Sequence, residues 1–236
     1  MSALFSDFDH VLTTTRSVRK RLDFDRPVPA DVVYECLEIA LQAPTGGHAE
    51  DWRFVMVGDP AIRAALGDIY LRNFMDNVWN PLQEAGATHG KVAGRLGGAG
   101  ADGSMSDRTA RMLDGAKYLA DNVGRAPWLM VACATRPNPE RGGPGTSSAV
   151  YGSVYPAIWS FNLALRSRGL GSVLTTLHLH SPDEVSSLLG MPAEVTHVAL
   201  LPVAYTVGTD FKPGARRPVE EVVYRDAWGT PFSASK

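Results

Sequence analysis

The sequence contains few cysteines and has no large excess of either positive or negative charge. Of its 236 residues only Cys36 and Cys133 are cysteines, and neither belongs to a CxxC pair or to a run with metal-ligand spacing. A disulfide framework and a zinc finger are therefore excluded. The 23 basic residues nearly balance the 25 acidic ones, which leaves a formal net charge of −2. Neither a nucleic acid nor an anionic membrane surface is an expected partner of such a chain.

The N-terminus lacks the pattern of a secretory signal. It reads MSALFSDFDHVL, with acids where a signal peptide needs a basic start, and no adequate apolar run follows. The cytoplasm is therefore the expected compartment.

Self-contained catalytic motifs are missing as well. The GxSxG elbow of a serine hydrolase does not occur. Gly98–Gly103 match GxGxxG in form, but no apolar strand precedes them, as a dinucleotide-binding fingerprint requires. His178 and His180 have no third ligand at an obvious spacing, so no metal site is expected. A chain without an acid–base or nucleophile set is expected to use a cofactor for its chemistry.

The dominant feature that is present is an apolar segment from Ser147 to Arg168. Small and apolar residues occupy nearly every face, which predicts a helix buried all round and not an amphipathic one. Spacings of three and four residues divide it into two stripes. The first stripe holds Val150, Val154, Ile158, Phe161 and Leu165, and the second holds Tyr151, Tyr155, Trp159 and Leu163. One stripe can pack on the chain's own sheet, and the other requires a second subunit. An ordinary core helix of a monomer is the alternative.

The remaining elements suggest a single domain spanning residues 1–236. Helices are expected over Pro29–Ala43, Pro60–Trp79, Arg108–Val123 and a short stretch from Ser181, and strands over Pro127–Ala134, Ser172–Leu179 and Thr196–Tyr205. Pro127–Ala134 is apolar on both faces and should be a central strand. At about residues 80–107 the composition shifts to glycine, alanine and polar residues. A run of this kind is expected to be a flexible substrate lid or a docking loop for a partner.

Donors for an anion occur near both ends of the chain. Basic residues cluster at Arg16–Arg21 and at Arg216–Arg217. Guanidinium groups next to a hydroxyl suit phosphate oxygens, so a phosphate-bearing small molecule is a better match than a polymer. Solvated surface charge is the alternative. The turn at Pro44–His48 contains two glycines, which allow either close approach of the backbone to a ligand or a tight helix-to-strand connection.

Taken in order, these motifs resemble those of the FMN-dependent nitroreductase family. Arg16-Ser17-Val18-Arg19 is similar to the family's RRSxR, and Ala43–Phe54 is similar to its APSGGNxQPWxF. A buried helix that ends in Gly169–Ser172 and an Arg-x-Pro at Arg216–Pro218 follow at family spacing. The resemblance covers most of the chain.

The resemblance implies a fold and an activity. The fold is α+β, a mainly antiparallel central sheet surrounded by helices, in an intertwined homodimer whose C-terminal segments cross to the other subunit. FMN would lie at the dimer interface and carry the chemistry, with NADPH or NADH as electron donor. A nitroaromatic, a quinone or a similar small molecule would then accept the electrons in a ping-pong mechanism. Reductive dehalogenation or flavin-consuming chemistry is the alternative within the family, and a non-catalytic flavin-binding module is the alternative outside it.

The resemblance also implies the residues that bind the flavin. The ribityl phosphate and the pyrimidine edge would be bound by Arg16, Ser17 and Arg19, together with Arg216 and the neighbouring Arg217. The partner subunit's loop would pack against the flavin through Pro44, Thr45, Gly46 and His48. The strand that passes the isoalloxazine would hold Leu174, Thr175, Thr176 and Leu177, with Thr176 favoured at the reactive ring nitrogen.

The sequence departs from the family wording at three places. Thr15 stands where a first arginine is common, His48 replaces an asparagine, and Glu50-Asp51 replaces Gln-Pro. The acid pair is expected either to alter the hydrogen bonding of the flavin loop or simply to face solvent.

Overall fold

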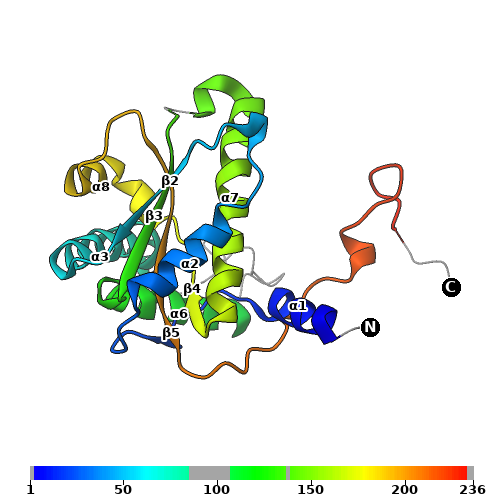
Figure 1. Cartoon of the computed structure of the whole chain (residues 1–236), viewed down its shortest axis with the longest axis horizontal. Helices are drawn as coiled ribbons and strands as arrows, with labels where there is room; N and C mark the ends of the chain where they lie inside the picture. The colour runs from blue at the N-terminus through cyan, green and yellow to red at the C-terminus, as the bar shows by residue number, and fades with distance from the viewer. Residues whose placement is uncertain (1–2, 85–106, 137–138, 233–236) are drawn as a thin grey trace. The chain divides into compact units, whose positions relative to one another are not determined.

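The computed structural model describes residues 3–84, 107–136 and 139–232 and divides the chain into two compact units (Figure 1). The larger unit is Arg16–Thr209, and the smaller one joins Met1–Thr15 to Asp210–Lys236. Each unit is described by itself below. Most of the expected lid, residues 85–106, lies outside the described residues. Its first residues are not a loop, because Asn80–Glu84 form helix α4.

The larger unit is built on a five-stranded sheet in which every pair of strands is antiparallel, as expected. The strands are β1 (Leu22–Asp23), β2 (Trp52–Val57), β3 (Trp128–Ala134), β4 (Leu170–Ser172) and β5 (Thr196–Thr206). Their order is β1-β5-β3-β2, and β4 also pairs with β5. Strand β3 lies between β5 and β2 and is buried from Leu129 to Ala134, which confirms that it is a central strand.

Helices cover both faces of this sheet (Figure 1). The larger unit contains α2 (Ala30–Ala40), α3 (Pro60–Phe74), the π-helical turn η2 (Met75–Trp79), α6 (Asp107–Asn122), α7 (Gly143–Ser167) and α8 (Pro182–Leu189). It also contains the short 3₁₀ helices η1 (Gly46–His48), η3 (Val123–Arg125), η4 (Pro139–Gly142) and η5 (Leu177–His180). The main core forms where α2 and α7 pack on one face of β3 and β5, burying alternate strand residues such as Met130 and Ala132.

The smaller unit contains α1 (Ala3–Thr14) and η6 (Val219–Glu221). Its C-terminal end folds back through an isolated bridge between Tyr224 and Pro231. The Tyr224 ring lies 4.8 Å from the ring of Trp228, which is 91% exposed.

Within one chain, helix α7 is buried on one stripe and open on the other, and cover of the open stripe by a second subunit stays a prediction. Its first stripe is in the core, where Ile158 is 1% exposed. Its second stripe is open, since Tyr155 is 40% and Trp159 is 46% exposed. The structure therefore decides which stripe packs on the chain's own sheet, and it leaves the aromatic stripe at the surface.

One prediction about the strands is wrong. The expected strand Ser172–Leu179 ends as β4 at Ser172 and continues into the 3₁₀ helix η5. Ser181 precedes α8 as expected, and its hydroxyl donates to Asn73 Oδ1 at 3.0 Å. The other helices lie where they are expected, although α7 begins four residues early, at Gly143, and the α-helical part of Pro60–Trp79 ends at Phe74, before the π-helical turn η2.

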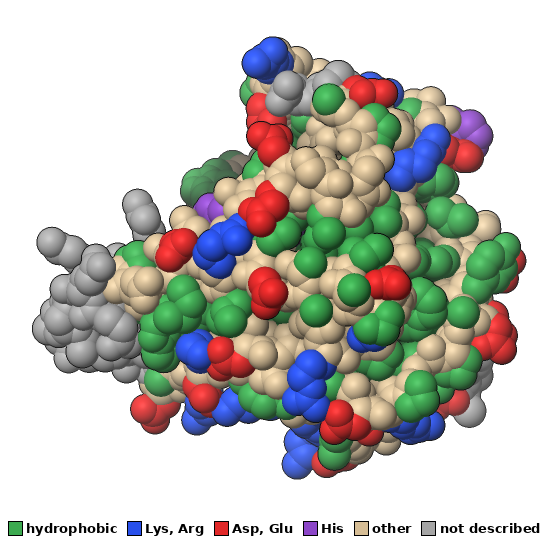
Figure 2. Space-filling view, turned by 90° about the vertical axis from the view of Figure 1, so that its left-hand side faces the viewer, with side chains coloured by type: hydrophobic (Ala, Val, Ile, Leu, Met, Phe, Trp, Pro, Cys, Tyr) green, Lys and Arg blue, Asp and Glu red, His purple; other side chains and the backbone are tan. Residues whose placement is uncertain are grey.

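Surface charge is mixed in sign. On the face shown in Figure 2, lysine and arginine side chains lie among aspartate and glutamate side chains, with apolar side chains between them. Within the described ranges, no helix is both long enough and apolar enough to cross a membrane.

Candidate functional site

The N-terminal basic motif is attached to the end of α7 through β4. Ser17 forms a parallel bridge with Ser172, and the Val18 amide donates to the Ser172 carbonyl at 2.9 Å. Gly171 makes this approach possible, because a Cβ there would lie 3.1 Å from Val18 Cγ2 and 2.6 Å from Thr206 Cγ2. Burial of Val18, 6% exposed, anchors the segment in the core. The motif is thereby held beside the strand that follows α7.

A cavity of about 310 Å³ opens where this motif meets the exposed stripe of α7. Its volume is at the lower end of the range for small-molecule pockets, about 300–1,000 Å³. The motif and strand side of the cavity is lined by Arg16, Ser17, Ser172, Val173 and Leu174, and the helix side by Tyr155, Ile158, Trp159 and Asn162. A guanidinium, hydroxyls and an amide set among apolar and aromatic walls suit a planar apolar ligand that carries a polar, anionic chain.

Two polar atoms of this lining fit a ligand of that kind. Asn162 Oδ1 and Ser172 Oγ are buried and have no hydrogen-bond partner among the described residues. Buried polar atoms in native proteins are nearly always paired, so their partner is expected on whatever fills the cavity. Sequence reasoning missed both residues. The available signal was their polarity in an otherwise apolar stretch.

Arg19 is placed differently from its two predicted neighbours, because it does not line the cavity. It is half-buried beside Tyr70 of α3, and its Cδ would lie 3.5 Å from a Cβ on Gly115 of α6. Burial lowers the pKa of Arg19, and the nearby Tyr70 opposes that shift. Burial also raises the pKa of Tyr70 to about 12, against the effects of a hydrogen bond with Thr175 and of Arg19. Arg19 is thus a half-buried cation that is linked to Thr175 through Tyr70.

The segment Leu174–Leu177 runs past the cavity without forming a regular strand. Thr175 exchanges two backbone hydrogen bonds with Leu200, each 2.9 Å, and its hydroxyl donates to the Leu200 carbonyl at 2.9 Å. The Leu177 carbonyl accepts a hydrogen bond from Asn73 Nδ2 at 3.0 Å. Between them Thr176 is exposed, and the chain turns there into η5. Leu174 lines the cavity, whereas Thr175 is committed to the sheet.

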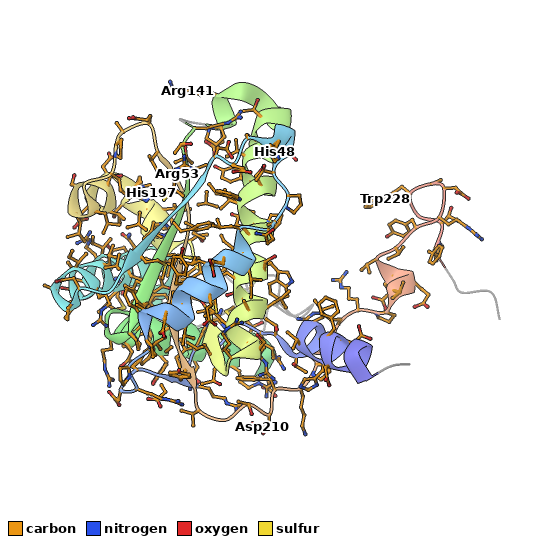
Figure 3. All side chains as sticks on the ribbon, in the orientation of Figure 1. His48, Arg53, Arg141, His197, Asp210 and Trp228 are labelled. Atoms are coloured by element: carbon orange, nitrogen blue, oxygen red, sulfur yellow. The ribbon has the colours of Figure 1, made fainter. Side chains whose placement is uncertain are left out.

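The predicted flavin loop Pro44–His48 does not line this cavity of its own chain. The Gly46 amide donates to Ser153 Oγ at 2.9 Å, which fixes the loop on the N-terminal half of α7, where Figure 3 shows His48. Gly47, His48 and Glu50 have positive φ angles of 62°, 54° and 47°. Backbone strain at two non-glycine residues is typical of functional loops.

The structure assigns a role to one member of the acid pair. Asp51 is 8% exposed and forms a 2.6 Å ion pair with Arg136, while its carbonyl accepts the Thr135 amide at 2.8 Å. Asp51 therefore holds the ends of β2 and β3 together. Glu50 lies at the surface, with its carboxylate 3.7 Å from His48 Nε2.

Arg216 and Arg217, the predicted C-terminal phosphate ligands, belong to the smaller unit. Both are exposed, in the segment between β5 and η6 that has no regular structure. The cavity belongs wholly to the larger unit, so their part in the site remains a prediction.

Comparison with known proteins places this chain in a family. The model of the nitroreductase family matches residues 12–208. An iodotyrosine deiodinase of Thermotoga neapolitana is 27% identical over 223 residues, which are 91% of this chain and 95% of the relative. An NADH dehydrogenase of Thermus thermophilus is 26% identical over 216 residues, which are 88% of this chain and 90% of the relative.

Solved structures share the fold. The FMN-dependent nitroreductase NfnB from Mycobacterium smegmatis, in complex with NADPH, matches with a TM-score of 0.65 and 17% identity, covering 95% of this chain and 100% of its own. An iodotyrosine deiodinase bound to FMN and 3-iodo-L-tyrosine matches with a TM-score of 0.62 and 23% identity, covering 92% of this chain and 98% of its own. The family match over most of the chain agrees with the fold, and the protein belongs to the nitroreductase family of flavin oxidoreductases.

Proposed function

We propose that the protein is an FMN-dependent oxidoreductase that uses NADPH or NADH to reduce a nitroaromatic, a quinone or a similar acceptor by a ping-pong mechanism. The observation that carries this proposal is the cavity in which Arg16 and Ser17 meet Leu174 and the aromatic stripe of α7. Membership of the nitroreductase family and the relatives described as an NADH dehydrogenase and as an NADPH complex support the choice of electron donor.

When bound, FMN supplies two-electron chemistry that couples the nicotinamide to the acceptor. The residues of this chain bind and position it. Arg16 and Ser17 would donate to the phosphate through charge-assisted hydrogen bonds, and the same role is proposed for Arg216 and Arg217. Tyr155 and Trp159 provide apolar walls that exclude water from the ring. The exposed Thr176, at the turn into η5, would offer its hydroxyl and its backbone to the reactive edge of the ring.

Arg19 completes the predicted phosphate motif from behind the cavity. Its contact with Tyr70, which hydrogen-bonds Thr175, joins the basic motif to the strand segment that carries the ring-facing residues. We assign it a positioning role, through which the motif and the Leu174–Leu177 segment keep a constant separation.

The functional unit in this proposal is a homodimer. The second stripe of α7 leaves Tyr155 and Trp159 exposed on the wall of the cavity, and a patch of this kind is typical of an interface. The loop Pro44–His48 does not line its own cavity, and we propose that it covers the flavin of the partner. The C-terminal segment then crosses to the other subunit, and residues 1–236 act as a single domain in each. Buried free thiols at Cys36 and Cys133 agree with a cytoplasmic location.

The absorbance spectrum of the purified protein tests the first step of this proposal, because bound flavin is yellow. Anaerobic stopped-flow reduction with NADPH and with NADH tests the second. Rapid loss of the flavin absorbance with one donor, followed by reoxidation on addition of a nitroaromatic or a quinone, is the expected result. Colourless protein that takes up no FMN contradicts the proposal. Bound FMN that both donors reduce only slowly indicates a non-catalytic flavin-binding module.

Reductive dehalogenation is a second candidate, favoured by the 27% identity to an iodotyrosine deiodinase along nearly the full length of both chains. In this reaction an aryl carbon–iodine bond takes up two electrons and a proton, an aryl carbon–hydrogen bond forms, and iodide leaves. Incubating the flavin-loaded protein with a chemical reductant and 3-iodo-L-tyrosine, and measuring iodide, tests it. Release of iodide at the rate of the buffer control eliminates this candidate. Reoxidation of the flavin by a nitroaromatic or a quinone then tests the first candidate.

A further inference from the structure

We propose that Asn162 and Ser172 bind the ribityl hydroxyls of FMN, an inference that rests on the proposed function. Asn162 comes from α7 and Ser172 from the end of β4, two elements that pack against each other in the core (Figure 1). Both side chains line the cavity that also contains Arg16 and Ser17. Polar groups from two sides of the cavity are therefore available to one ligand.

The hydrogen-bonding state of these two side chains sets them apart from others nearby. Ser153 Oγ on the same helix donates to the Ala149 carbonyl at 2.7 Å, and Thr175 Oγ1 donates to Leu200. Asn162 Oδ1 and Ser172 Oγ are buried, yet neither has a partner in the described parts of the chain. A buried polar atom without a partner destabilises the folded protein, so a ligand that pairs with both atoms is favoured.

The chemistry of the two groups selects the part of the flavin that they contact. Asn162 Oδ1 can only accept a hydrogen bond, whereas Ser172 can donate and accept. The phosphate dianion offers acceptors alone, so it cannot satisfy Asn162 Oδ1, and Arg16 is the matching group for it. The apolar faces of the ring suit Tyr155 and Trp159. A polyol chain carries a donor and an acceptor on every hydroxyl, and it joins the ring to the phosphate.

The binding affinities of three flavins distinguish the possible contacts. FMN has a ring, a ribityl chain and a phosphate, riboflavin lacks the phosphate, and lumiflavin lacks the ribityl hydroxyls as well. Each is titrated by fluorescence into the unmodified protein, Asn162→Leu, Ser172→Ala and the control Ser167→Ala. Ser167 is an exposed residue at the end of α7 that does not line the cavity, and its hydroxyl donates to the Ala164 carbonyl at 2.9 Å.

We expect Asn162→Leu and Ser172→Ala each to raise the dissociation constants of FMN and riboflavin by about tenfold, the equivalent of one well-formed hydrogen bond to a buried group. Lumiflavin affinity should be unchanged, and the control should match the unmodified protein with all three ligands. The thermal midpoint of the flavin-free variants should not fall, because each substitution removes an unpaired buried polar atom. Ser172→Ala removes a single oxygen and decides the question alone if Asn162→Leu fails to fold.

Other outcomes overturn the assignment. Equal weakening of lumiflavin places the groups at the ring edge, and weakening of FMN alone places them at the phosphate. Unchanged affinity for all three flavins removes any role in binding. If the unmodified protein binds no flavin, the proposed function itself fails, and the result is distinct because it is seen before any substitution is made.

Discussion

Acid should destabilise this protein through a buried histidine. His178 is 1% exposed, its ring lies 5.8 Å from that of His197, and neither of its nitrogens has a partner among the described residues. Burial, with a smaller contribution from His197, lowers the pKa of His178 from 6.5 to about 3. Burial also lowers the pKa of His197, which Asp183 opposes, and Ser186 Oγ lies 2.8 Å from His197 Nε2.

The difference in proton uptake between the folded and unfolded states decides how the free energy of unfolding changes with pH. The unfolded chain protonates His178 near pH 6.5, while the folded chain does so only near pH 3, so the unfolded state binds more protons between these values. The stabilisation is complete above pH 6.5 and is lost progressively as the pH falls toward 3. At pH 5, 1.5 units below the unfolded pKa, the loss should be about 2 kcal/mol in the free energy of unfolding.

Urea unfolding at pH 7.5 and pH 5.0 measures this loss. The comparison is between the unmodified protein, His178→Gln and the control His180→Gln, which replaces an exposed histidine two residues away. Carboxylates titrate in all three proteins, so their effect cancels. The unmodified protein and the control should lose about 2 kcal/mol more than His178→Gln between the two pH values. Equal losses in all three proteins would refute the reasoning.

Three further predictions concern the interface, the phosphate and the acid pair. Trp159→Glu should abolish both the dimer and FMN binding with little change in thermal midpoint, whereas Ile158→Glu should prevent folding because it buries a charge at a position 1% exposed. Sedimentation measures the dimer and flavin absorbance measures FMN binding, and a flavin-loaded monomer of the unmodified protein contradicts the shared site. Arg16→Ala and Arg216→Ala should each weaken the affinity for FMN about tenfold or more, since a charge-assisted contact contributes about 1.5–3 kcal/mol, and should leave the affinity for riboflavin unchanged. Equal weakening of the affinities for both flavins rules out a phosphate contact. Asp51→Asn should lower the free energy of unfolding by about 1 kcal/mol, because the arginine partner is half-exposed, and should not alter FMN affinity; a large loss of FMN shows instead that the acid acts on the flavin loop.

Prediction from sequence succeeded where the information is local. The spacing of apolar residues predicted β3, β5 and α7 at their positions in the chain. A strand and a helix each have their own repeat of buried residues, so this signal is local. The family motifs at Arg16–Arg19 and Ala43–Phe54 predicted the antiparallel α+β fold, which the family model and the solved structures confirm. Arg16, Ser17 and Leu174 line one cavity, and binding of a flavin by these residues stays a prediction.

Prediction failed where a residue's state depends on a distant partner. Periodicity could not say which stripe of α7 is buried, because both have the same spacing and only packing on β3 and β5 distinguishes them. The strand expected over Ser172–Leu179 is regular only as far as Ser172: Thr175 still bridges Leu200, but the chain then turns into η5, where the Leu177 carbonyl accepts a hydrogen bond from the distant Asn73. The sequence left open whether Asp51 acts on the flavin loop or faces solvent, and it gave no sign of the ion pair with Arg136, which lies far along the chain and 2.6 Å away.

The sequence by itself thus determined most of the elements and the family, and it predicted the groups that suit a flavin phosphate, since each depends on residue type and short-range spacing. Only the tertiary structure decided that Asn162 and Ser172 share a cavity with Arg16, that the aromatic stripe of α7 forms its wall, and that His178 is buried beside His197. These facts depend on contacts between distant segments. Hydrogen-bond pairing and exclusion of water become defined only when those segments pack together.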